Sequence, residues 1–214
     1  MASPADAFDR RNLLTYVSLL CGVAAVAVAS GRHAHMAGFA VAVAVIADTF
    51  DGRFARRFGT DPRRRALGVE LDSLADAIAF GIAPPLCSAL FLNVGMDVVG
   101  SALWGAAFIY AACAVTRLAS YNVNAVGDEP GSPEPQGGGG SRGFVGIPVP
   151  LAALIWSSVL LLQPSAAATI LLILVTAAAM VLPLRIPRPA GAGLVLFTCW
   201  PLAVAVLHAK ALWP

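Results

Sequence analysis

The sequence predicts an all-α integral membrane protein, a polytopic bundle with a six-helix core and one or two further C-terminal helices. Of the 214 residues, 58% are hydrophobic and only 12% are charged, whereas soluble domains carry about 25% charged residues. The mean hydropathy is +0.78. A membrane-spanning helix needs about 20 mostly apolar residues. Stretches of that kind cover residues 12–31, 36–56, 67–93, 98–122, 145–163, 165–183 and 190–209.

The first apolar stretch follows a short polar leader and is longer than the apolar region of a signal peptide, so we expect a retained helix. The cysteines all lie in apolar stretches, which argues against a disulfide framework and against a metal-ligand spacing. They are Cys21, Cys87, Cys113 and Cys199.

Basic residues fall almost entirely on one side of the expected membrane. With the N-terminus inside, every arginine and lysine except Arg32 and Lys210 lies on the cytoplasmic side, as the positive-inside rule requires. We therefore expect a protein of the cytoplasmic (inner) membrane. Its basic cytoplasmic face suits anionic headgroups and diphosphates, and a nucleic-acid partner is not expected.

The chain reads as one transmembrane domain, residues 1–214, without an internal repeat. The longest connection, about 123–144, is rich in Gly and Pro and is expected to be a flexible cytoplasmic linker, with a substrate-gating loop as the alternative. Pro148 and Pro150 suit the first turn of the fifth helix. Pro84 and Pro85 should interrupt or kink the third helix.

Four aspartates lie in or beside the second and third apolar stretches: Asp48, Asp51, Asp72 and Asp76. Each charge within a membrane helix costs about 2.5–3.5 kcal/mol by insertion scales, so the group requires compensation. Spacings of three and four residues place each pair on one helix face, and a short connection lets the two pairs meet. Repelling carboxylates are neutralised by hard divalent cations. Mg²⁺ or Mn²⁺, in a two-ion site, fits this ligand set better than zinc or copper.

Small and basic residues accompany the aspartates. Gly52 and Gly68 each stand one helical turn from an aspartate and leave the backbone uncluttered, so that a phosphate or nucleotide can approach. Ala55 is small for the same reason, and Arg56 is suited to phosphate oxygens. The cluster therefore predicts a metal site beside a phosphate-binding surface at the cytoplasmic ends of two helices.

These residues resemble the signature of the CDP-alcohol phosphotransferase family, D-x2-D-G-x2-A-R followed by G-x3-D-x3-D. Between Arg56 and Gly68 the chain is three residues longer than the family pattern, at Asp61 to Arg65. Asn12 and Thr15 look like the family's N-x-x-T element, which contacts the CDP-lipid. The resemblance covers residues 12 to 190 and implies a homodimer.

Other segments resemble the phosphatidylserine synthase branch of this family. They are Leu71 to Asp76, Phe80 to Pro84, Arg117 to Asn122 and Gly146 to Pro150. Ala79 and Ser120 depart from the pattern of the branch. The branch implies transfer of a phosphatidyl group from CDP-diacylglycerol to L-serine with release of CMP.

The family resemblance assigns roles to individual residues. Asp76 would be the general base as well as a metal ligand. The CDP-lipid would be bound by Asn12, Thr15, Asp48, Gly52, Ala55, Arg56 and Gly68. An intramembrane arginine is a functional candidate, and we place Arg117 in the acceptor pocket, completed by Tyr121 and Asn122.

Other functions are compatible with parts of the pattern. Glycerol 3-phosphate or inositol phosphate as acceptor would use further basic residues, and Arg185 and Arg188 leave this open. An ether-lipid CDP donor is a further alternative. Prenyltransferases lack the continuation from Gly52 to Arg56. A transporter or channel would spread polar groups across the membrane.

Overall fold

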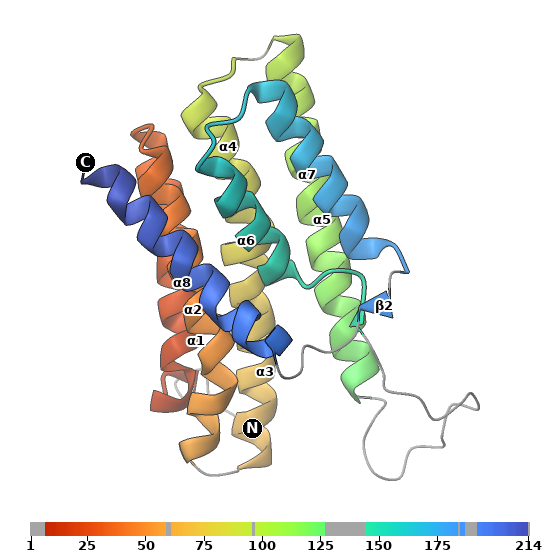
Figure 1. Ribbon diagram of the computed structural model, residues 1–214. Coiled ribbons are helices and arrows are strands. Elements are labelled where there is room, and N and C mark those ends of the chain that lie inside the picture. Colours follow the sequence, from red (N-terminus) through yellow and green to blue (C-terminus); the bar gives the residue numbers. More distant parts are fainter. Residues whose placement is uncertain are drawn as a thin grey trace.

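The computed structural model describes residues 7–58, 61–95, 97–126, 144–183, 185–186 and 192–213. In these residues the chain forms a bundle of helices (Figure 1). The helices are α1 (Leu13–Ser30), α2 (Ala34–Ala55), α3 (Pro62–Asp76), α4 (Ala83–Leu92), α5 (Val98–Val126), α6 (Val149–Leu160), α7 (Ala166–Val181) and α8 (Ala192–Leu212). Two-residue strands, β1 (Phe144–Val145) and β2 (Arg185–Ile186), pair antiparallel.

Four helical rods in the described part of the chain are long and apolar enough to cross a membrane. They are Arg10–Ser30, Ala34–Phe58, Pro62–Leu92 and Val98–Val123. Shorter apolar helices cover Val149–Leu160, Ala166–Val181 and Thr198–Leu212. Each of the seven predicted apolar stretches thus contains a helix, and the prediction of an all-α membrane protein is confirmed.

Small residues let the helices approach closely, as is usual in membrane bundles. The buried core is rich in alanine, including Ala25, Ala42 and Ala79. Helix α2 packs against α1, α6 and α8, and α5 packs against α7. A Cβ atom on Gly22 of α1 would lie 2.6 Å from the Cα atom of Ala79. Only glycine permits that approach.

The bundle has two ends with different chemistry. The "aspartate end", in the lower part of Figure 1, contains the end of α2, the beginning of α3 and the beginning of α1. The "histidine end", in the upper part, contains the turn between α1 and α2, the turn between α6 and α7, and the end of α8. The predicted metal aspartates and the three histidines therefore lie at opposite ends, as expected.

The basic segment before Gly68 is helical, although the sequence suggested a loop. Helix α3 begins at Pro62, and the Asp61 carboxylate accepts a hydrogen bond from the backbone N–H of Arg63 at 3.1 Å. An aspartate N-cap followed by proline is a strong start signal. The three-residue extension is therefore an added helical turn.

The predicted linker at about 123–144 starts later than expected, because α5 continues to Val126. Residues 127–143 lie outside the described part of the chain. Pro148 and Pro150 stand at the start of α6, as predicted.

All four cysteines are free thiols, which agrees with the prediction of no disulfide framework.

Pro84 and Pro85 do not break the third rod. Between α3 and α4 the chain forms a π-helical segment, Ala77–Ile82, and the N–H of Ala83 donates to the carbonyl of Ile78 five residues earlier. Proline supplies no N–H and clashes with the preceding turn. The wider helix accommodates both prolines, which are buried.

Candidate metal and nucleotide site

Three of the predicted metal ligands meet between α2 and α3. One carboxylate oxygen from each of Asp48, Asp72 and Asp76 lies within 4.8 Å of the other two. Asp76 is nearly buried, with 9% of its surface exposed. Carboxylates gathered at this separation repel one another and form a suitable ligand set for a hard divalent cation.

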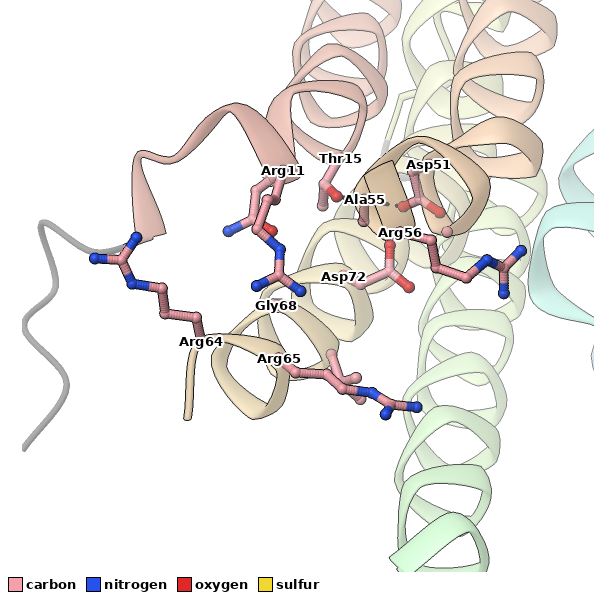
Figure 2. A pocket seen from close by; sticks show the side chains of 12 residues that line it. Arg11, Thr15, Asp51, Ala55, Arg56, Arg64, Arg65, Gly68 and Asp72 are labelled. Carbon is pink, nitrogen blue, oxygen red and sulfur yellow. Dashed lines mark hydrogen bonds between the residues drawn. The ribbon is translucent and has the colours of Figure 1, made fainter. Parts of the chain in front are cut away.

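The fourth aspartate, Asp51, lies beside this group. The hydroxyl of Thr15 on α1 donates to its Oδ2 atom at 3.2 Å. In Figure 2 the carboxylates of Asp51 and Asp72 point into the same space between α2 and α3. The N-terminal helix thus orients one aspartate of the cluster through a side-chain hydrogen bond.

A cavity of about 360 Å³ opens next to the aspartates. Figure 2 shows the side chains around it. Its lining residues are Arg11, Asn12, Thr15, Asp51, Gly52, Ala55, Arg56, Arg64, Arg65, Gly68, Val69 and Asp72. Every residue predicted to bind the CDP-lipid lines this cavity, except Asp48, which belongs to the adjoining carboxylate group.

The two motif glycines border the cavity. A Cβ atom on Gly52 would meet no other atom within 4 Å, so the backbone there faces open space. A Cβ atom on Gly68 would lie 3.2 Å from the Oδ1 atom of Asn12. Asn12 is held by its own hydrogen bond to the carbonyl of Ala7 at 2.9 Å. These glycines leave backbone accessible to a bound molecule.

Four arginines line the cavity, of which the motif indicated only Arg56. Arg64 reaches the carboxylate of Asp9 at 3.2 Å and so ties the start of α3 to the segment before α1. Arg11, Arg64 and Arg65 were not predicted as site residues. The only sequence signal for them was the high density of arginine on this side.

The predicted acceptor residues lie on α5, near the aspartates. The buried Nε atom of Arg117 has no hydrogen-bond partner among the described residues. Asn122 donates to the hydroxyl of Ser73 at 2.9 Å. Tyr121 is half exposed. Ser73, which follows a metal-ligand candidate directly, was missed because its partner is distant in sequence.

The family model described as CDP-alcohol phosphatidyltransferase matches residues 11–184. The chain therefore belongs to this family. The matched range contains the whole aspartate cluster, all residues that line the cavity and the predicted acceptor residues of α5. The sequence resemblance to the family is confirmed.

Curated relatives carry more specific names. A CDP-diacylglycerol–serine O-phosphatidyltransferase of Helicobacter pylori is 34% identical over 152 residues, which is 71% of this chain and 57% of the relative. The enzyme of that name from Mycobacterium tuberculosis is 35% identical over 71% of this chain and 49% of its own length. An archaetidylserine synthase of Methanothermobacter thermautotrophicus is 28% identical over 70% and 57%. The chain spans about half the length of these relatives.

Proposed function

We propose that this protein transfers a phosphatidyl group from CDP-diacylglycerol to L-serine and releases CMP. One observation carries the proposal. Carboxylate oxygens of three aspartates lie within 4.8 Å of one another, next to a cavity that is lined by glycines and arginines. The family match and the names of the relatives support the same reaction.

The carboxylates would hold divalent metal, Mg²⁺ or Mn²⁺. Asp48, Asp72 and Asp76 supply oxygen ligands at a suitable mutual distance, and we propose that Asp51 completes a two-ion set. The bound ions would neutralise negative charge on the diphosphate and on the departing CMP. The ligand chemistry, all oxygen and without histidine or thiolate, favours these hard cations.

The cavity would hold the cytidine diphosphate part of the donor. Gly52 and Gly68 let the nucleotide approach the backbone, while Asn12 and Thr15 border it from α1. Arg56 and the neighbouring arginines suit phosphate oxygens, to which a guanidinium donates two hydrogen bonds at once. The lipid-linked phosphorus would then lie at the aspartate side of the cavity.

Asp76 would act as the general base. Its carboxylate takes the proton from the serine hydroxyl as the serine oxygen bonds to the lipid-linked phosphorus. The bond from that phosphorus to the CMP oxygen breaks, and CMP leaves with the electron pair. This role requires the hydroxyl to lie within about 2.6–3.2 Å of the carboxylate.

The acceptor would bind between α3 and α5. Arg117 has a buried Nε atom without a partner in the described structure, and a buried donor of this kind requires a ligand or water. We propose that it binds the carboxylate of serine, or the phosphate of the donor, near Asp76. Tyr121 and Asn122 would complete the pocket, with Asn122 positioned by Ser73.

A phosphorylated acceptor is the second candidate. The arginines at the cavity favour it, because glycerol 3-phosphate or inositol phosphate adds an anionic group. Of the two arginines considered for this role from the sequence, Arg185 belongs to β2 and Arg188 lies outside the described residues.

We place the aspartate end on the cytoplasmic side of the inner membrane, because the basic residues are concentrated on that side of the chain.

An acceptor panel tests the proposal. Purified protein is incubated with CDP-diacylglycerol, Mg²⁺ or Mn²⁺, and serine, glycerol 3-phosphate or inositol phosphate in turn, and CMP is measured. We expect release with serine and only background with the other two. Release with a phosphorylated acceptor alone would replace serine, and release with none would overturn the proposed reaction.

A further inference from the structure

A second cavity, of about 460 Å³, lies at the histidine end, away from the proposed active site. Its walls come from the turn between α1 and α2, the end of α4, the turn between α6 and α7, and the end of α8. The lining residues are Arg32, His33, Ala34, His35, Phe91, Leu92, Leu160, Gln163, Pro164 and Leu212. The proposed reaction uses none of them.

The lining chemistry favours an anionic amphiphile. Arg32 supplies a permanent positive charge, and the lining residues that the structure describes include no carboxylate. Such a site attracts an anion and offers an amine no acidic partner. Phe91, Leu160 and Leu212 form apolar wall beside these polar groups. A ligand with a negative headgroup and a hydrocarbon part satisfies both halves.

Two lining residues hold a backbone conformation that glycine would adopt with less strain. Arg32 has φ 61° and Gln163 has φ 48°, and both follow helix ends, where glycine is the usual residue in the left-handed region. Unlike asparagine, neither residue type is commonly found there. Both residues nevertheless line the cavity, which favours a role for their side chains in binding a ligand there.

A chain of hydrogen bonds fixes the polar wall. The carbonyl of Ser157 can only accept, so His208 Nε2, at 3.0 Å, carries a hydrogen, and in the neutral ring Nδ1 is then an acceptor. His35 Nδ1, 3.3 Å from His208 Nδ1, is then the donor. His35 Nε2 therefore accepts from the amide of Gln163 at 3.2 Å. The Ser157 hydroxyl donates to the carbonyl of Gly38 at 2.8 Å.

With this assignment each ring nitrogen atom of the two histidines has a partner of the correct kind. His208 is fully buried, and the chain joins α2, α6 and α8. Gln163 and His35 are therefore held in place at the cavity, while the Arg32 guanidinium supplies the charge. The polar wall of the cavity is therefore already in place before a ligand binds.

We infer that the cavity at the histidine end binds a phospholipid with an anionic headgroup, from the membrane leaflet on that side. The guanidinium of Arg32 would bind the phosphate through paired hydrogen bonds. Gln163 and the histidines would border the headgroup, and the leucines would contact the beginning of an acyl chain. The site is independent of the proposed donor site at the aspartate end.

Lipid-dependent thermal unfolding of the purified protein in detergent tests this inference. The probes are dihexanoyl phosphatidylglycerol, dihexanoyl phosphatidylcholine and inorganic phosphate. We expect phosphatidylglycerol to raise the unfolding midpoint more than either of the others does. In Arg32→Gly the concentration that gives half of this shift should rise at least about tenfold, the factor for a loss of 1.4 kcal/mol.

Lys210→Ala is the matched control, because it removes one exposed cation at the same end without touching the cavity lining. It should change the half-maximal concentration less than twofold. Arg32→Gly without lipid should unfold no earlier than the wild type, since glycine relieves the backbone strain. CMP release from the aspartate end should be unchanged. Gln163→Gly provides a second variant with the same expected direction.

Three results would overturn the inference. Equal weakening by Arg32→Gly and Lys210→Ala would indicate general charge attraction to the membrane surface. Equal shifts with phosphatidylcholine would remove the preference for an anionic headgroup. A full, Arg32-dependent shift with inorganic phosphate alone would make the ligand a free anion.

Discussion

Two glycines of α2 show how the aspartate end and the histidine end differ. Gly52 faces open space in the cavity beside the aspartates, whereas a Cβ atom on Gly38 would overlap the ring of His208. The first glycine leaves room where we propose that the donor binds, and the second makes room for a side chain of the protein itself. At the aspartate end the backbone of α2 is left open, whereas at the histidine end it packs against a chain of hydrogen-bonded side chains.

The largest effect is expected at the aspartate end. Asp76→Asn should lower serine-dependent CMP release by about 100-fold to 10,000-fold, because the amide cannot accept the acceptor proton. Asp97→Asn at the other end is the control, since its Oδ1 atom caps the N–H of Gly100 at 2.9 Å and asparagine retains that oxygen. Near wild-type release by a folded Asp76→Asn protein at saturating metal would exclude the base role.

Gly38→Ala should lower the free energy of unfolding by about 1–3 kcal/mol, as overpacking of a full core does. The added methyl group would meet the buried His208 ring. The measurement is the thermal midpoint in detergent. Gly105→Ala is the control, because a Cβ atom there meets nothing within 4 Å. An unchanged midpoint for Gly38→Ala would mean that the histidine chain moves at little cost.

Gly52→Ala should behave in the opposite way. The fold has space for the methyl group, and alanine is the better helix former, so the midpoint should not fall. The methyl group projects where the nucleotide is proposed to bind, and the KM for CDP-diacylglycerol should rise about tenfold. If KM is unchanged, the donor does not approach α2 at this position.

The smallest effect concerns Thr15. Thr15→Val removes its hydrogen bond to Asp51, and a bond of this kind contributes about 0.5–1.5 kcal/mol. The Mn²⁺ concentration for half-maximal CMP release should rise about threefold to tenfold. Thr176→Val, whose hydroxyl bonds within its own helix, should leave the metal requirement unchanged. A metal requirement equal to the wild-type value in Thr15→Val would show that the hydrogen bond does not orient the cluster.

Local sequence patterns predicted the helices and the aspartate cluster. Helical periodicity places Asp72 and Asp76 on one face, and a short connection to α2 brings Asp48 near them. Partners distant in sequence escaped prediction. Ser73 and Asn122, or His35 and His208, meet only after the bundle has packed, and no local spacing encodes such pairs.

Some departures from the prediction have local causes. Asp61 and Pro62 begin a helix where a loop was expected, because the cap outweighs the run of arginines that follows. The prolines after Ile82 widened the helix instead of breaking it. The position of the prolines in the sequence does not show whether packing against the neighbouring helices favours a widened helix or a broken one.

The π-helical segment Ala77–Ile82 also sets the angular phase between the two halves of the rod that runs from α3 to α4 in Figure 1. Each residue of an α-helix turns the chain by about 100°, and a wide turn holds one residue more. Asp76 can therefore face the other aspartates while the Ser88 hydroxyl accepts the indole N–H of Trp156 at 2.8 Å. Deleting Ala77 would rotate one half against the other by about that angle. Because of the inserted residue, α3 and α4 can each turn the correct face to a different neighbour although they form one continuous rod.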